Sequence, residues 1–98
     1  MSDAPQIRSI LDLSTAHLPE EFGQTLHELD GVIADLKGEY GYLMWVPPDP
    51  ERWAWESVDG PAPAEILTVQ VYARRFGCDY VLFDRDGPVN PDLPVWDW

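Results

Sequence analysis

Apolar residues alternate with polar ones in some stretches of the chain and recur every three or four positions in others. This difference separates expected strands from expected helices. The stretch IRSILDL at 7–13 alternates and predicts a strand. The stretch YGYLMWV at 40–46 is aromatic and apolar, which is typical of a buried strand. The stretch DYVLFD at 79–84 predicts a last strand near the end of the chain.

The clearest helical spacing lies within residues 19–37. Pro19 suits the first turn of a helix, where its missing N–H costs nothing, and Gly38 is typical of a helix end. Gly23 and Gly31 weaken such a helix by about 1 kcal/mol each relative to Ala. The apolar positions step by four, three, four and three residues and predict one buried helix face: Phe22, Leu26, Leu29, Ile33 and Leu36.

A second helix is predicted at 63–76, opened by Pro63 and closed by Gly77. Residues 47–62 lie between the strand expected at 40–46 and the helix expected at 63–76. They are rich in proline and charge, which favours an irregular excursion. The alternation of tryptophans within it predicts a short edge strand at 52–56.

The resulting order is β-α-β-loop-α-β. Alternating helices and strands favour a small layered α/β fold, with two helices on one face of a three- to four-stranded sheet. The 98 residues fit one domain, 1–98, and an apolar content of 45% with five tryptophans is enough for a core.

The charge changes the picture of function. Eighteen Asp and Glu residues oppose six Lys and Arg residues, which gives a net charge of −12. Such a chain repels nucleic acids and anionic membranes and attracts basic surfaces. No leader or membrane-spanning stretch is visible, so we expect a cytoplasmic protein. Cys78 is the single cysteine, and the neighbouring Asp79 disfavours a reactive thiolate, so Cys78 is interpreted as a small core residue.

The acids gather on the expected first helix and in the proline-rich excursion. From Glu21 to Asp35 a helix would span roughly 21 Å, and its carboxylates would form a line comparable to the phosphates of DNA. Trp53 and Trp55 are candidate apolar anchors, unless both pack on the sheet. The predicted partner-binding acids are Glu20, Glu21, Glu28, Asp35, Glu39, Asp49, Glu51, Glu56 and Asp59.

The string VLFDRDG at 81–87 resembles the nucleophile motif of haloacid-dehalogenase phosphatases. Those enzymes need further acids and a lysine encoded downstream, but here eleven residues follow Gly87 and the one lysine, Lys37, is expected on the acidic helix. The preferred interpretation is a turn, in which Asp84 and Asp86 accept hydrogen bonds from local N–H groups and Gly87 adopts a left-handed conformation. No cofactor, metal or catalytic residue is predicted.

Two terminal stretches carry a resemblance to a known family. LDLSTAHLP at 11–19 and GCDYVLFDRDGPV with LPVWDW at 77–98 resemble a family of small proteins of bacterial mobile elements, largely of unknown function. The chain also resembles type I-C anti-CRISPR inhibitors of phages and mobile elements. That resemblance implies a monomer that binds a CRISPR surveillance complex as a DNA mimic, through its PAM-reading subunit, and does not bind nucleic acid itself.

Two alternatives stay open. A protein–protein adaptor or antitoxin-like module of a mobile element would need an apolar patch, and its binding would survive high salt. A metal-dependent phosphate-ester enzyme would use His17, Asp84 and Asp86.

Overall fold

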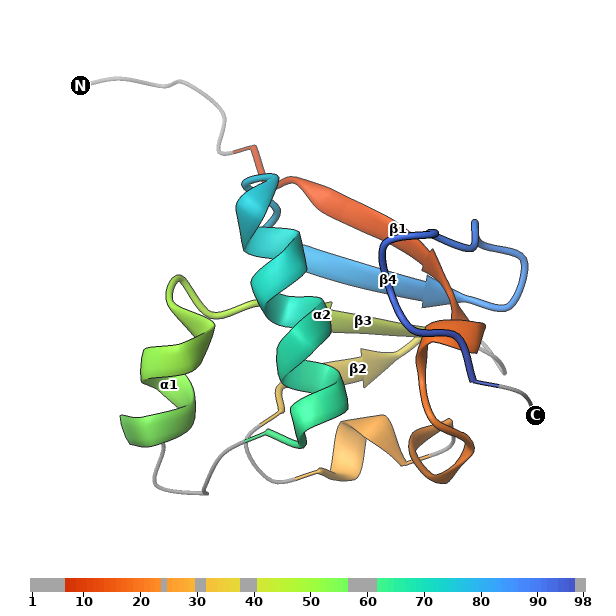
Figure 1. The fold of residues 1–98 in the computed structure, drawn as a ribbon, viewed down its shortest axis with the longest axis horizontal. Helices are drawn as coiled ribbons and strands as arrows, with labels where there is room; N and C mark the ends of the chain where they lie inside the picture. The colour runs from red at the N-terminus through yellow and green to blue at the C-terminus, as the bar shows by residue number, and fades with distance from the viewer. Residues whose placement is uncertain (1–6, 24, 30–31, 38–40, 57–61, 97–98) are drawn as a thin grey trace.

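A computed structural model shows one four-stranded mixed sheet with helices packed against it (Figure 1). The structure describes residues 7–23, 25–29, 32–37, 41–56 and 62–96. The strands lie in the order β1-β4-β3-β2, where β4 is parallel to β1 and antiparallel to β3, and β3 is antiparallel to β2. Their bounds are Ile10–Ser14 for β1, Ala34–Leu36 for β2, Gly41–Trp45 for β3 and Tyr80–Asp84 for β4.

Two α-helices complete the layers. Helix α2, Ala64–Arg75, passes in front of the strands in Figure 1, and α1, Pro50–Glu56, packs beside it. Between β1 and β2 the described chain forms three 3-10 turns: η1 at Thr15–His17, η2 at Glu20–Phe22 and η3 at Leu26–Glu28. The expected layered α/β fold with two helices is therefore confirmed, in a single small domain.

The core lies between the sheet and α2. Ile66, Val69 and Ala73 recur at helical spacing and are buried, whereas Phe76, which the same spacing predicts on this face, is 64% exposed. Burying a side chain of this size stabilises the fold by roughly 1.5–3 kcal/mol. The opposing buried side chains from the strands are Leu13, Tyr42, Met44, Val81 and Phe83, and Leu18 and Leu26 close one end.

The predicted helix at 19–37 is wrong. The described part of that stretch holds η2, η3 and the strand β2. Its apolar residues do not share one face, because Leu26 is fully buried while Ile33 and Leu36 are 54% and 51% exposed. Instead, β2 extends the sheet by pairing with β3, so its backbone hydrogen bonds are made between strands.

The predicted edge strand at 52–56 is also wrong, because these residues belong to α1. Asp49 precedes the helix and its Oδ1 accepts the backbone N–H of Arg52 at 3.2 Å, the bond of an N-cap. Pro50 follows at the first helical position, where proline is favoured. These two residues start a helix, which overrides the alternation of the tryptophans.

The remaining predicted elements are confirmed, with small shifts. The strands expected at 40–46 and 79–84 are β3 and β4, and the helix expected at 63–76 is α2. Gly77 ends α2 with a φ of 71°, a conformation that glycine adopts without strain. The first strand begins later than predicted, since β1 runs from Ile10 to Ser14.

Candidate binding surface

The described carboxylates lie mostly at the surface. Of the twelve Asp and Glu side chains that the structure describes, ten are exposed, so most of this negative charge faces solvent. These ten are Asp12, Glu20, Glu21, Glu28, Asp35, Asp49, Glu51, Asp84, Asp86 and Asp92.

The predicted line of acids along one helix does not exist. Glu21 lies in η2, Glu28 in η3 and Asp35 in β2, so three separate elements carry them. All three are nonetheless exposed, and they remain available to a partner. Glu39, Asp59 and the side chain of Glu56 lie outside the described residues.

The two candidate anchor tryptophans have different surroundings. Trp53 is half-buried, and its ring meets that of Trp45 edge-on, with ring centroids 5.2 Å apart. It therefore packs against a sheet residue, as the alternative interpretation predicts. Trp55 is 90% exposed and has room to contact a partner.

Trp55 borders a groove of about 500 Å³ between α1, α2 and the C-terminal segment. Tyr72 closes one side, where its hydroxyl donates to Asp92 Oδ2 at 2.9 Å and accepts from Asn90 Nδ2 at 3.0 Å. The groove can therefore hold an apolar side chain next to a positive charge. Its apolar lining comes from Ala54, Trp55, Leu67, Val71, Tyr72 and Leu93, and its charged residues are Glu51, Arg75 and Asp92.

The Asp84–Gly87 segment forms a tight turn, in which Asp84 Oδ1 accepts the Asp86 N–H at 3.0 Å. Gly87 does not adopt the expected left-handed conformation, since Gly77 is the one glycine in the described ranges with positive φ. Instead, a Cβ at Gly87 would lie 2.5 Å from the carbonyl oxygen of Leu13. Glycine is therefore required because the turn packs against β1.

Lys37 lies just after β2, not on an acidic helix. It lines a hollow of about 730 Å³ together with Asp84, Arg85 and Asp86. The structure thus places a lysine nearer to these aspartates than the sequence pattern indicates. No group of three or more His, Cys, Asp or Glu residues in the described part of the chain could hold a metal ion.

His17 is buried and connects the two motifs that carry the family resemblance. Its Nδ1 lies 2.7 Å from the Pro94 carbonyl, and its Nε2 accepts the Asn90 N–H at 2.8 Å. Because a carbonyl can only accept, Nδ1 carries the proton and donates. The Trp96 N–H adds a bond to Ala16 O at 2.8 Å. With both ring nitrogens bonded to backbone, His17 has a structural role.

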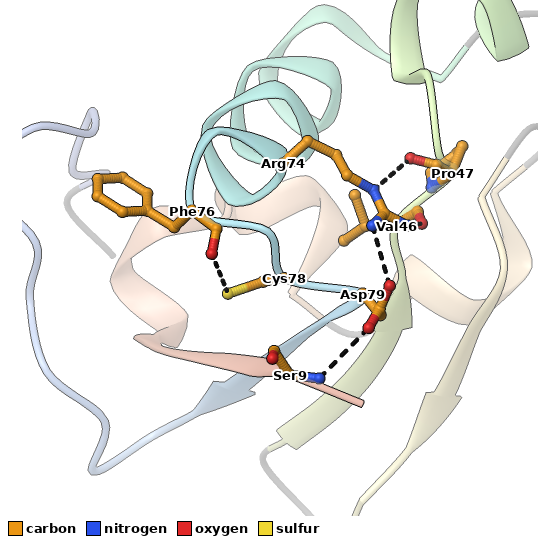
Figure 2. A network of polar contacts seen from close by, with 7 residues as sticks. All are labelled: Ser9, Val46, Pro47, Arg74, Phe76, Cys78 and Asp79. Atoms are coloured by element: carbon orange, nitrogen blue, oxygen red, sulfur yellow. Dashed lines mark hydrogen bonds and ion pairs between the residues drawn. The ribbon is translucent and has the colours of Figure 1, made fainter. Parts of the chain in front are cut away.

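Arg74 of α2 forms the centre of a second network (Figure 2). Its Nε and Nη2 donate to the carbonyls of Pro47 and Val46 at 2.8 and 2.6 Å, and its Nη1 donates to Asp79 Oδ1 at 2.9 Å. The other Asp79 oxygen accepts the Ser9 N–H at 3.3 Å. Arg74, and next the Ser9 N–H, hold the pKa of Asp79 below its ordinary value.

Cys78 lies beside this network. It is buried, and its Sγ lies 3.9 Å from the Phe76 carbonyl (Figure 2). The interpretation of Cys78 as a small core residue is confirmed.

Comparison with known proteins gives a family and no activity. None of the helices in the described ranges is long and apolar enough to cross a membrane. No curated protein and no solved structure matches the chain. Residues 10–98 match the C-terminal domain of a family of unknown function, DUF5983, and because this match covers most of the chain, the chain belongs to that family.

Proposed function

We propose that this protein is a non-enzymatic inhibitor that binds a type I-C CRISPR surveillance complex and blocks its recognition of target DNA. In this proposal the exposed carboxylates imitate DNA phosphates on the basic surface that reads the duplex. The observation that carries the proposal is the 90% exposed side chain of Trp55, which borders an apolar groove next to Glu51 in a strongly acidic molecule.

Charge sets the chemistry of the partner. The ten exposed carboxylates of the described ranges and a net charge of −12 favour a surface rich in Lys and Arg, and they speed the encounter with it. Because the acids lie on several turns and strands, the resemblance to DNA is one of charge density over a surface. It does not depend on one helix.

Charge alone gives weak, salt-sensitive attachment, so a specific complex needs an apolar anchor. Trp55 supplies one, since tryptophan is enriched among residues that dominate binding energy. The groove beside it can accept an apolar side chain from the partner, and Glu51 can meet a neighbouring Lys or Arg.

The identity of the partner rests on the resemblance of the chain to type I-C anti-CRISPR inhibitors. The PAM-reading subunit is the first target to test, because its surface holds duplex DNA. The proposal takes the protein to act as a monomer in the bacterial cytoplasm, without cofactor and without binding nucleic acid itself.

The test is binding to the purified type I-C surveillance complex at two salt concentrations, with and without target DNA. We expect salt-sensitive binding that target DNA excludes. Trp55→Ala should weaken it about tenfold or more, as loss of an anchor does. The control is Ile7→Ala, which removes an 81% exposed apolar side chain that does not line the groove. No binding at either salt concentration would contradict the proposal.

A phosphate-ester enzyme is the second candidate, because Lys37 and Arg85 line one hollow with Asp84 and Asp86. Its test is hydrolysis of p-nitrophenyl phosphate with added Mg²⁺. Turnover that disappears in Asp84→Asn would favour this candidate over the inhibitor. The adaptor or antitoxin-like module is distinguished by binding that survives high salt.

A further inference from the structure

The strand registers define a face of the sheet opposite α2, where α1 reaches the sheet through the contact of Trp53 with Trp45. Side chains alternate along each strand, so the residues next to the buried Leu13, Met44 and Phe83 point to the other side. Helix α2 and the C-terminal segment lie on the buried side, which faces the viewer in Figure 1. The apolar residues of the outer face are Ile10, Ile33, Leu43, Trp45, Tyr80 and Leu82.

One row across this face is apolar in the centre and acidic at both edges. Leu82 of β4 is paired with Leu43 of β3. Asp12 of β1 is paired with Leu82, and Asp35 of β2 is paired with Leu43. Both aspartates are exposed, so two carboxylates bracket a pair of half-buried leucines.

The neighbouring row is apolar throughout, from Ile10 of β1 to Ile33, which precedes β2. Tyr80 is paired with Trp45 in the centre, and Ile10 is paired with Tyr80. On the other side, the Trp45 N–H donates to the Ile33 carbonyl at 2.8 Å. The two isoleucines at the edges are 51% and 54% exposed, and with Tyr80 and Trp45 between them they form one contiguous apolar strip that is partly open to solvent.

The charges around the face decide which occupant fits. Aromatic residues on an open sheet bind bases in some RNA-binding domains. Here Asp12, Asp35 and Asp84 outnumber the neighbouring Lys37 and Arg85, so the face as a whole would repel the phosphates. A second copy would bring the same carboxylates together, in a molecule that already carries −12. A protein surface with an apolar centre and a rim of Lys and Arg would complement both rows, because its apolar centre would contact the apolar residues and its rim would meet the aspartates.

We propose that the outer face of the sheet docks onto such a basic, apolar-centred protein surface. The inference rests on the proposed function in one respect, because it takes the same basic partner as the occupant. It adds a contact on the opposite side of the sheet from the groove beside Trp55. A partner that reaches both surfaces would wrap around the molecule from α1 to the open sheet.

The first experiment measures binding of the surveillance complex to the double variant Ile10→Ser/Ile33→Ser. Both side chains lie at sheet edges and are about half exposed, so their replacement leaves the core intact. We expect the Kd to rise about tenfold or more, as loss of apolar contacts within an interface does. Val89→Ser, at a 57% exposed residue outside the strands, is the control and should leave the Kd unchanged.

The second experiment does not depend on the surveillance complex. A peptide of alternating Lys and Leu is titrated into the isotope-labelled protein, and amide shifts are followed by NMR. We expect shifts at Leu43, Trp45 and Leu82. A matched peptide of alternating Glu and Leu should produce none. If the complex does not bind but the basic peptide shifts these residues, the proposed function fails while the docking face stands.

Three results would overturn the docking face. The double variant could bind the surveillance complex as tightly as the unmodified protein does. The basic peptide could shift the α1–α2 groove alone or no residue at all. Sedimentation could show a dimer that the Ile10→Ser/Ile33→Ser variant loses, which would assign the face to a second copy.

Discussion

His17 joins two parts of the chain that are more than 70 residues apart in sequence. Both ring nitrogens are bonded to backbone groups of the C-terminal segment, and the residue is 2% exposed. The imidazole suits this place because it offers one donor and one acceptor on opposite sides of a small ring. The motifs STAH and LPVW therefore belong together for a structural reason.

Replacing His17 with Ala should destabilise the protein by about 2–4 kcal/mol, because it removes two hydrogen bonds and leaves a buried cavity. The measurement is urea unfolding, together with hydrogen exchange of the Asn90 and Trp96 amides, which should become faster. The control is His27→Ala, whose half-buried ring stacks on Tyr42 and should contribute about 1 kcal/mol. Unchanged exchange at Asn90 would contradict the role given to His17.

Replacing Gly87 with Ala should also destabilise the protein, by about 1–3 kcal/mol, because the new Cβ would collide with the Leu13 carbonyl. The atoms that the Cβ would meet are backbone atoms of Leu13 and Asp84, so the collision cannot be relieved by moving a flexible side chain. Asp86→Ala in the same turn is the control. The Asp86 backbone N–H donates to Asp84 Oδ1, and the Asp86 side chain, which this variant removes, is exposed. Equal unfolding midpoints for the two variants would show that the turn relaxes.

The elements that could be predicted from sequence are those whose signals are local. Helix α2 has regular apolar spacing and a glycine at its end, and β3 and β4 are short apolar runs. The helix predicted at 19–37 is wrong because the spacing of its apolar residues is also compatible with separate turns. Gly23 lowers its helix propensity, and pairing with β3 gives Ala34–Leu36 an alternative set of backbone bonds.

The Arg74–Asp79 network makes stability depend on pH. The pKa of Asp79 is lowered, first by the hydrogen bond from Arg74, below its ordinary 3.8. A carboxyl with a lower pKa in the folded state stabilises the fold above pH 3.8, and this contribution disappears as the pH falls through the lower folded value. It ties the end of α2 to the ends of β1 and β3.

Asp79→Asn should therefore lower the unfolding free energy at neutral pH. Its difference from the unmodified protein should shrink as the pH falls below 3.8, and it should vanish below the lower folded pKa, where the carboxyl is protonated in both states. Urea unfolding at a series of pH values measures this difference. Asp35→Asn, at an exposed carboxyl on β2, is the control and should show a small difference at every pH. A difference for Asp79→Asn that persists unchanged into strong acid would contradict the ion pair.

At the scale of the whole molecule, charge could be predicted from the sequence and its arrangement could not. The sequence predicts the acids and Trp55 as candidate binding residues, but the open face and the groove depend on which strands become neighbours. The parallel pairing of β1 with β4 joins residues about 70 positions apart, and no local pattern encodes it. The shared face of Asp12, Leu43 and Leu82 can therefore be recognised only once the strand register is known.

The net charge of −12 leads to a last prediction, in which salt affects folding and binding in opposite directions. Ten exposed carboxylates repel one another in the folded state, and raising NaCl from about 10 to about 150 mM shortens the Debye length from roughly 30 to 8 Å. The unfolding free energy should rise by about 1 kcal/mol, because self-repulsion is screened. Binding to the basic partner should weaken over the same range, because attraction is screened as well.

Both quantities are measured on the same samples, by urea unfolding and by titration of the surveillance complex, with choline chloride as a second salt of the same ionic strength. Glu20→Gln/Glu21→Gln/Glu28→Gln removes three exposed charges and should reduce both salt slopes. Binding that weakens with salt while stability rises supports the charge mimic. If stability rises with salt while binding does not change, charge screening has been demonstrated in this protein but does not affect the complex. The binding affinity would then come from apolar contacts alone. The adaptor would then replace the inhibitor as the leading function.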